Sequence, residues 1–238
     1  MLSKLSFDKR REEMSKWIKR IIFGVLAMVT AYLIVGIAIS DYVFPPEKVQ
    51  LGSYFRSGDK FNSRSEGFNQ TMLANKDGWI QLSLEVLPFA EGPPMHLHEN
   101  FEETFTIKTG TLSIMVAGEK RTLRAGESFT VPRMTFHKPF NETGETVVVE
   151  SSENTRTMPT QFAYILSQIY PIVDESNGRP SVAKMMMQTS VWGNDMDSYL
   201  ADGPPVPVQK VMRLILRPAA RMLGYKYHND DYKPLRPN

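Results

Sequence analysis

Three of the four histidines in this 238-residue chain have a spacing that suits a metal site. His96 and His98 are one residue apart, Glu103 follows them, and His137 lies further along. Side chains two positions apart on an extended strand point to the same face, so His96 and His98 can both project inward. Imidazole and carboxylate together suit iron, manganese, nickel or zinc, and the absence of Cys excludes a thiolate site. We therefore expect one divalent transition metal held by His96, His98, Glu103 and His137.

Glu103 has two competitors for the acidic position, because Glu99 and Glu102 lie beside it. On a regular strand, alternation places Glu102 on the face opposite to Glu103. We predict that Glu103 is both a metal ligand and the catalytic base, which requires its carboxylate to swing off the metal. The fourth histidine, His228, lies in a basic stretch beside Tyr227, and we interpret it as a solvated residue.

The residues around these side chains form two spaced motifs. The first motif has Gly92, His96-Leu97-His98, Glu103 and Gly110, and the second has Gly126, Pro132, His137 and Asn141. With these motifs, residues 67–152 resemble the cupin superfamily. The chain departs from the cupin pattern at two positions. Three residues separate Gly92 from His96 where the cupin pattern has five, and Met134 stands where the second motif has Gly, so the shape of that turn is open.

The resemblance implies a cupin-type double-stranded β-helix, a jelly-roll barrel, with the metal in its interior. The strand pattern independently favours an all-β sandwich or barrel, because short apolar runs alternate with Gly-rich turns. These runs fall at residues 79–87, 101–108, 111–116, 121–124, 128–131, 136–140 and 146–151. Each motif occurs once, which predicts a single cupin domain, and single cupins often pair through their sheets, so a homodimer is plausible.

Residues 21–40 contain no charged side chain and are interpreted as a transmembrane helix. Twenty helical residues span about 30 Å, which matches the hydrocarbon core of a bilayer. Trp17 before the run and Tyr42 and Phe44 after it are placed like interfacial aromatics. Residues 1–20 carry a net charge of +4, so the positive-inside rule places the N-terminus in the cytoplasm and the cupin domain outside.

Two other interpretations of residues 21–40 compete with the anchor. Ala38-Ile39-Ser40 has the small-x-small pattern of a signal-peptide cleavage site, but signal h-regions of about 7–15 residues are shorter than this run. A buried core helix of this length would be expected to show a polar face. The uncleaved anchor is therefore favoured over both.

The chain is accordingly divided into a basic cytoplasmic N-terminus (1–20), the transmembrane helix (21–40), a tether (41–66), the cupin barrel (67–152) and a C-terminal helical extension and tail (153–238). The polar residues that follow the membrane segment also allow an edge strand. Net charge is +2 overall, but residues 21–203 carry −7, so a nucleic-acid partner is disfavoured.

The C-terminal extension is predicted to contain helices over residues 162–170, 182–192 and 208–223. In the last of them Arg213, Arg217 and Arg221 form one stripe, and Pro218 is expected to kink the helix or end its first part. A basic amphipathic helix can lie on an anionic membrane surface. The favoured alternative is a helix packed on the barrel with a solvated basic face. Adjacent methionines 185–187 are interpreted as generally buried.

These features leave three classes of function. The first is a metal-dependent enzyme on a small oxygen-rich molecule, and the resemblance implies dioxygenases, decarboxylases and isomerases as models, with an oxygenase-like oxidoreductase favoured. The second is a non-catalytic module that binds or senses a small extracytoplasmic ligand. The third is a barrel whose metal only stabilises the fold. Catalysis is placed slightly ahead of binding.

Overall fold

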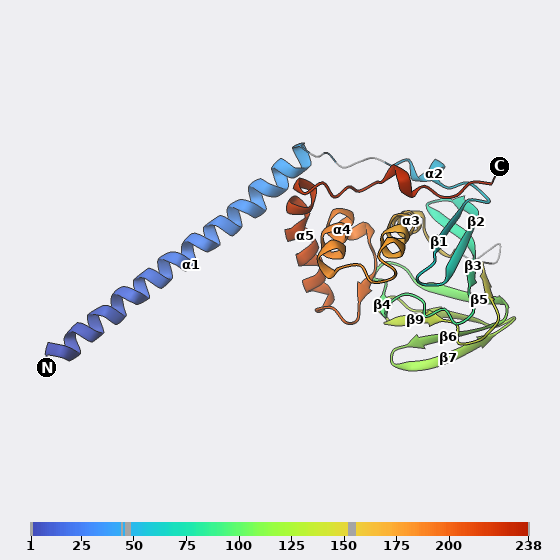
Figure 1. The fold of residues 1–238 in the computed structure, drawn as a ribbon, viewed down its shortest axis with the longest axis horizontal. Coiled ribbons are helices and arrows are strands. Elements are labelled where there is room, and N and C mark those ends of the chain that lie inside the picture. The colour runs from blue at the N-terminus through green and yellow to red at the C-terminus, as the bar shows by residue number, and fades with distance from the viewer. Residues whose placement is uncertain (1, 44, 46–48, 152–155, 238) are drawn as a thin grey trace.

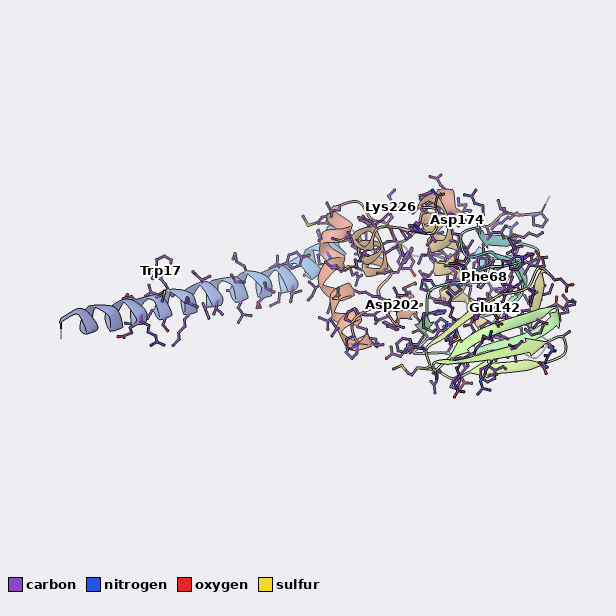
Figure 2. The ribbon with its side chains drawn as sticks, turned by 60° about the horizontal axis from the view of Figure 1, so that its bottom comes forward. Trp17, Phe68, Glu142, Asp174, Asp202 and Lys226 are labelled. Carbon is purple, nitrogen blue, oxygen red and sulfur yellow. The ribbon has the colours of Figure 1, made fainter. Side chains whose placement is uncertain are left out.

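The computed structural model describes residues 2–43, 45, 49–151 and 156–237. Helix α1 (Leu2–Val43) projects from a domain made of two β-sheets and a group of C-terminal helices (Figure 1). The helices lie in the order α3, α4, α5 from the sheets toward α1, so α5 forms the side of the domain nearest to α1 (Figure 1). Trp17 points away from α1 into the surroundings (Figure 2). The segment Arg11–Gly36 of α1 is long and apolar enough to cross a membrane, a property that a signal sequence shares.

The strands of the described residues form two sheets. The first sheet has the order β1 (Lys60–Ser63), β2 (Phe68–Lys76), β3 (Trp79–Val86), β10 (Val147–Glu150), β5 (Glu103–Thr109) and β8 (Ser128–Val131), with β11 (Met158–Pro159) also paired to β3. The second sheet has the order β12 (Tyr199–Leu200), β4 (His96–Leu97), β9 (His137–Phe140), β6 (Thr111–Val116) and β7 (Glu119–Arg124). All pairings are antiparallel.

The expected closed barrel is corrected to an open sandwich of the cupin type. No strand among the described residues is hydrogen-bonded into both sheets, so the sheets face each other without closing. Alternation along the strands fills the space between them, as in β5, where Phe105 and Ile107 are buried. On the first sheet, Met72, Ile80 and Val86 are fully buried, and the core continues into α3.

The segment before the sandwich contributes more structure than a plain tether. It contains the short helix α2 (Leu51–Tyr54) and the edge strand β1, which pairs with β2. Phe55 and Phe61 are buried in the core. Lys60 also forms a bridge with Leu235, so the C-terminal tail covers this edge of the sheet.

The C-terminal extension forms α3 (Thr160–Glu175), α4 (Val182–Trp192), the 3₁₀ helix η1 (Gly193–Asp195), α5 (Val206–Met222) and the 3₁₀ helix η2 (Asp230–Tyr232). Pro218 neither ends α5 nor interrupts it, because the helix continues through it to Met222. The expectation of a solvated arginine stripe is wrong, since Arg213 and Arg221 are buried. His228 is not a solvated residue either, because its Nδ1 lies 3.0 Å from the Tyr164 hydroxyl and its ring stacks on Tyr164.

The two positions where the chain departs from the cupin motifs are both compatible with the fold. Gly92 has φ +69°, and a Cβ there would lie 1.9 Å from the carbonyl oxygen of Pro139, so no side chain fits. Met134 has φ +61° and keeps the left-handed turn that glycine would adopt. Its N–H donates to the carbonyl of His98 at 2.7 Å, which ties this turn to the histidine segment.

Replacing Met134 tests the strain of this turn. The left-handed conformation costs a non-glycine residue about 1–2 kcal/mol, and glycine gives back about 0.5–1 kcal/mol through its greater freedom in the unfolded chain. Because the Met134 side chain is exposed, Met134→Gly should raise the free energy of unfolding by about 0.5–1 kcal/mol. Met134→Val should lower it, because a β-branched residue tolerates positive φ poorly. Denaturant unfolding measures both, and equal stabilities for the two variants would contradict a strained turn.

Candidate metal centre

The site lies between the two sheets and takes side chains from both. His96 on β4 is directly opposite His137 on β9 in the second sheet, and His98 follows β4 immediately. Glu103 begins β5 in the first sheet. The ligand atoms of these four residues all lie within 4.8 Å of one another. The structure therefore brings together the complete set of side chains that the sequence predicts.

Each histidine ring is oriented by a backbone carbonyl. The Nδ1 atoms of His96, His98 and His137 lie 2.8, 2.5 and 3.0 Å from the carbonyl oxygens of Pro94, Asp197 and Thr135. A carbonyl only accepts, so each Nδ1 carries a proton and donates it. In the neutral ring this leaves the lone pair on Nε2, which is the tautomer that a metal-binding histidine needs.

Glu103 joins the histidines through one oxygen. Its Oε2 lies 2.8 Å from Nε2 of His137 and 3.4 Å from Nε2 of His98. Burial alone would raise the pKa of Glu103, but the hydrogen bonds with His137 and His98 outweigh it and hold that pKa well below its usual range. Burial likewise lowers the pKa of His137, but the hydrogen bond and charge of Glu103 raise it overall. The carboxylate is therefore ionised and strongly favours positive charge beside it.

His96 behaves differently from His137. Burial, followed by the neighbouring His98 and His137 rings, lowers the pKa of His96 to about 3. The His96 ring is therefore neutral at physiological pH, and its nitrogen lone pair is available to a cation.

The donor set fits a first-row divalent cation. Metal–nitrogen and metal–oxygen bonds of about 2.0–2.2 Å place neighbouring donors about 3–4 Å apart, and the two nitrogen–oxygen distances to Glu103 are 2.8 and 3.4 Å. The backbone carbonyls of Pro94, Asp197 and Thr135 fix the histidine tautomers that such a cation requires. His96, His98, Glu103 and His137 would hold the metal, and this donor set does not separate Fe, Mn, Ni and Zn.

Sequence reasoning missed Asp197, which holds the histidine segment from the C-terminal extension. Besides its carbonyl contact with His98, its carboxylate accepts the N–H groups of Glu99 and Asn100 at 2.9 and 2.8 Å. The following strand β12 then pairs with β4, with Leu200 opposite His96. Asp197 lies about a hundred positions away in the sequence, outside both motifs, so no local pattern signals its role.

The loop that carries Asp197 is held in turn by Arg213 of α5. The guanidinium of Arg213 donates to the carbonyls of Gly193, Met196 and Ser198 at 3.3, 2.6 and 2.6 Å. The buried Arg213 thus satisfies backbone acceptors that would otherwise be costly to bury. One residue of the predicted arginine stripe therefore has an inward structural role toward the site.

The site opens into a cavity of about 670 Å³ between the first sheet and the C-terminal helices. His96, His98 and Glu103 line it. The rest of the wall is mainly apolar, and most of it comes from strands of the first sheet and from all three C-terminal helices. Its apolar members include Phe68, Leu82, Leu84, Phe105, Val149, Met158, Phe162, Leu166, Ile169, Val173, Met185, Met186, Met196, Met212 and Leu216.

A small polar group interrupts this apolar wall. Gln70 and Tyr170 are both buried, and the Gln70 amide donates to the Tyr170 hydroxyl at 2.6 Å. Gln70 Oε1 has no hydrogen-bond partner among the described residues. Glu66 also lines the cavity, and burial, followed by the charge of Asp174, raises its pKa to about 7. The cavity therefore offers unused hydrogen-bonding capacity away from the histidines.

The remaining candidate residues of the sequence have other roles. Glu102 is exposed, as alternation predicts, and Glu99 pairs with Lys210 at 2.5 Å. Asn141 is buried, and its amide donates to the carbonyls of Val86, Leu87 and Glu145. The motif asparagine thus locks the turn after β9 onto the end of β3 and contacts no ligand residue.

Residues 83–151, less than a third of the chain, match the family model described as the cupin domain. Two facing antiparallel sheets with a three-histidine, one-glutamate cluster between them define this class of site. The chain therefore carries a cupin domain. No curated protein matches the sequence.

Several solved structures are similar to part of the chain. They include KdgF from a Halomonas species (23% identity, TM-score 0.32, 35% of this chain and 76% of that one). A cupin-2 domain protein from Shewanella frigidimarina has 25% identity and a TM-score of 0.30, over 34% of this chain and 74% of that one. An RmlC-like cupin from the same organism has 21% identity and a TM-score of 0.34, over 41% and 86% of the two chains.

Substituting Asp197 tests the dependence of the site on the extension. Asp197→Asn keeps the size of the side chain but replaces one acceptor oxygen with a donor, which cannot pair with a backbone N–H. Changes to residues that hold metal-binding side chains in place reduce metal affinity about 10- to 100-fold, and we expect a loss in that range. Titration calorimetry with Zn²⁺ or Mn²⁺ measures it, with the exposed Asp202→Asn as the matched control. Unchanged affinity in a folded Asp197→Asn protein would contradict the clamp.

Proposed function

We propose that this protein is a metal-dependent cupin enzyme, of the oxygenase type, that acts on a small molecule held in the cavity. The observation that carries the proposal is that His96, His98 and Glu103 of the four-donor cluster line an apolar cavity large enough for such a molecule. A divalent transition metal bound there would supply a Lewis acid for oxygen atoms of the ligand.

The groups around the metal position have different roles. The three backbone carbonyls hold the histidine rings, so little reorganisation is needed when the ligand arrives. The side chain of Glu103 is 16% exposed and faces the cavity, so it can reach a proton of a bound ligand as well as the cation. Glu103 is therefore assigned the roles of ligand and catalytic base.

The walls favour a particular kind of ligand. An oxygen-rich molecule would leave many polar groups unpaired against apolar side chains, which is unfavourable. A mainly apolar body with an oxygen-bearing group at the histidine end fits better. A second hydroxyl or amide on that body would pair with Gln70, whose amide has an unused polar atom in either orientation.

The alternative function is a non-catalytic module that binds or senses the same kind of molecule. It is favoured by the polar residues Gln70, Tyr170 and Glu66, which line the cavity away from the histidines. These side chains could recognise a bound molecule without taking part in a reaction. It is also favoured by the close contact of Glu103 with both His98 and His137. A carboxylate held in this way suits a residue that stays on the metal, and a catalytic base would have to leave it.

Metal content and turnover separate these functions. The wild-type protein is expected to carry about one transition metal per chain, and His98→Ala should lose it, whereas His228→Ala, outside the site, should retain it.

Glu103→Gln should reduce oxygen consumption with a panel of phenolic, keto-acid and sugar substrates by about 10²-fold or more, because removal of a general base typically costs this much. The neighbouring, exposed Glu102→Gln is the matched control.

Two results count against parts of this proposal. A metal-free wild-type protein would overturn the metal site itself. A metal-loaded protein without turnover, but with ligand-induced thermal stabilisation, would replace the enzyme by the binding module.

We further propose that α1 anchors the protein in a membrane, with the N-terminus in the cytoplasm and the cupin domain outside. The support is the apolar segment Arg11–Gly36, the absence of charge over residues 21–40 and the net charge of +4 before them. The long, exposed α1 seen in Figure 1 is otherwise an unfavourable apolar surface in water.

Accessibility of engineered thiols tests this topology, because the chain has no native Cys. In intact cells, a membrane-impermeant maleimide should label Glu119→Cys on the hairpin of β6 and β7, while Ser15→Cys should react only after permeabilisation. The mass of the purified chain should show an intact N-terminus. A mass that lacks the first 40 residues would establish a cleaved signal peptide instead, and the reverse labelling pattern would invert the topology.

A further inference from the structure

Helix α5 exposes an apolar face, although two of its arginines are buried. Every exposed residue of α5 is apolar, whereas Arg213 and Arg221 are among its buried residues. The outer face of α5, as defined here, consists of Val208, Val211, Leu214, Ile215, Met222 and the adjoining Leu223, which are 36–73% exposed. A contiguous apolar surface of this kind marks a site of contact with a protein or a membrane.

This orientation of α5 is fixed from the inside. The guanidinium of Arg213 is hydrogen-bonded to three carbonyls of the loop that carries Asp197, and it also lies 4.5 Å from the centre of the Tyr199 ring. Rotation of α5 to bury its apolar side would break these contacts. The outer face must therefore be covered by something outside the domain, or stay exposed.

Helix α1 contacts α5 beside this face. The hydroxyl of Tyr32 donates to the carbonyl of Ile215 and accepts the N–H of Ala219, both at 3.2 Å. One turn further along α1, the position of Gly36 lies against Pro218. Tyr32 and Gly36 both belong to the apolar segment Arg11–Gly36. A part of α5 is thus in contact with residues that would themselves lie at the depth of the bilayer.

The arrangement of the domain agrees with this contact. In both views α1 leaves the molecule on the side formed by α5, and the two sheets lie on the other side (Figures 1 and 2). A bilayer crossed by α1 would therefore meet α5 before any other part of the domain.

From these observations we infer that the outer face of α5 lies in the outer leaflet of the lipid bilayer that α1 enters, so that the domain is seated on the membrane. This inference rests on the proposed membrane location of α1 and adds a second, interfacial contact to it. The occupant is the lipid bilayer because the face is continuous with the apolar segment of α1 and displays no charged residue at its exposed positions.

Site-specific fluorescence in vesicles tests the inference on the full chain. Single cysteines are introduced at Leu214 and Val211 on the outer face of α5, and at Glu119 as the control on the exposed hairpin, and each is labelled with an environment-sensitive dye. Circular dichroism verifies that each variant folds. The labelled proteins are reconstituted into vesicles of phosphatidylcholine and phosphatidylglycerol, washed with sodium carbonate, and exposed separately to doxyl-labelled lipid and aqueous iodide.

The expected result is a shift of emission to shorter wavelength at Leu214 and Val211, with loss of intensity in doxyl lipid and little loss in iodide. Glu119 should show the opposite pattern. If the protein stays in the vesicles after the carbonate wash but iodide quenches the label at Leu214 as strongly as the label at Glu119, the α5 contact is overturned and the α1 anchor is not. Protection from both quenchers, together with disulfide-linked dimers of the unlabelled Leu214→Cys protein, assigns the face to a second copy and also overturns the α5 contact with lipid. Release of the chain by carbonate overturns the anchor and the α5 contact together.

Discussion

The geometry of the candidate metal centre depends on the hydrogen bonds that Asp197 makes to the segment from His98 to Asn100. Strand β4 has only two residues, and a strand of that length cannot fix two histidine side chains by its own pairing. Asp197 supplies the missing constraint with its carbonyl and both carboxylate oxygens. The site is therefore assembled by two distant parts of the chain, the cupin sheet and the C-terminal extension.

The same extension determines the environment in which the site works. Helices α3, α4 and α5 provide much of the cavity wall, and the aromatic ring of Phe162 on α3 lies 4.9 Å from the ring of His98. The Glu103 side chain is only 16% exposed, and in largely buried surroundings a charge and its partners interact more strongly than they would in water. The low pKa of Glu103 follows from this balance, since its bonds to His137 and His98 outweigh the penalty of burial.

Local patterns in the sequence predicted the parts of this arrangement that depend on local geometry. The alternation of strand residues predicted that His96 and His98 share one face and that Glu102 faces away from Glu103, and the apolar runs between glycines correctly indicated strands. Those patterns do not predict which segments, far apart in the sequence, pack against each other. Asp197 and the inward direction of the arginine stripe were missed for that reason, because both depend on the packing of α5 against the loop after α4. The open sandwich, in place of a closed barrel, likewise depends on pairings between strands that are distant in sequence.

Helix α5 links the site to the exposed apolar surface of the domain. If Arg213 turned outward, the buried carbonyls of Met196 and Ser198 would lose its guanidinium as a donor, at a cost of about 1–3 kcal/mol each. The contacts of Arg213 with the loop of Asp197 therefore fix the rotation of α5 about its axis. The apolar residues on the outer side of α5 cannot become buried without breaking these contacts. The exposed face of α5 is in this sense a consequence of how the histidines are held. A helix that buries Arg213 and Arg221 and exposes an apolar face is stable where the surroundings of that face are themselves apolar.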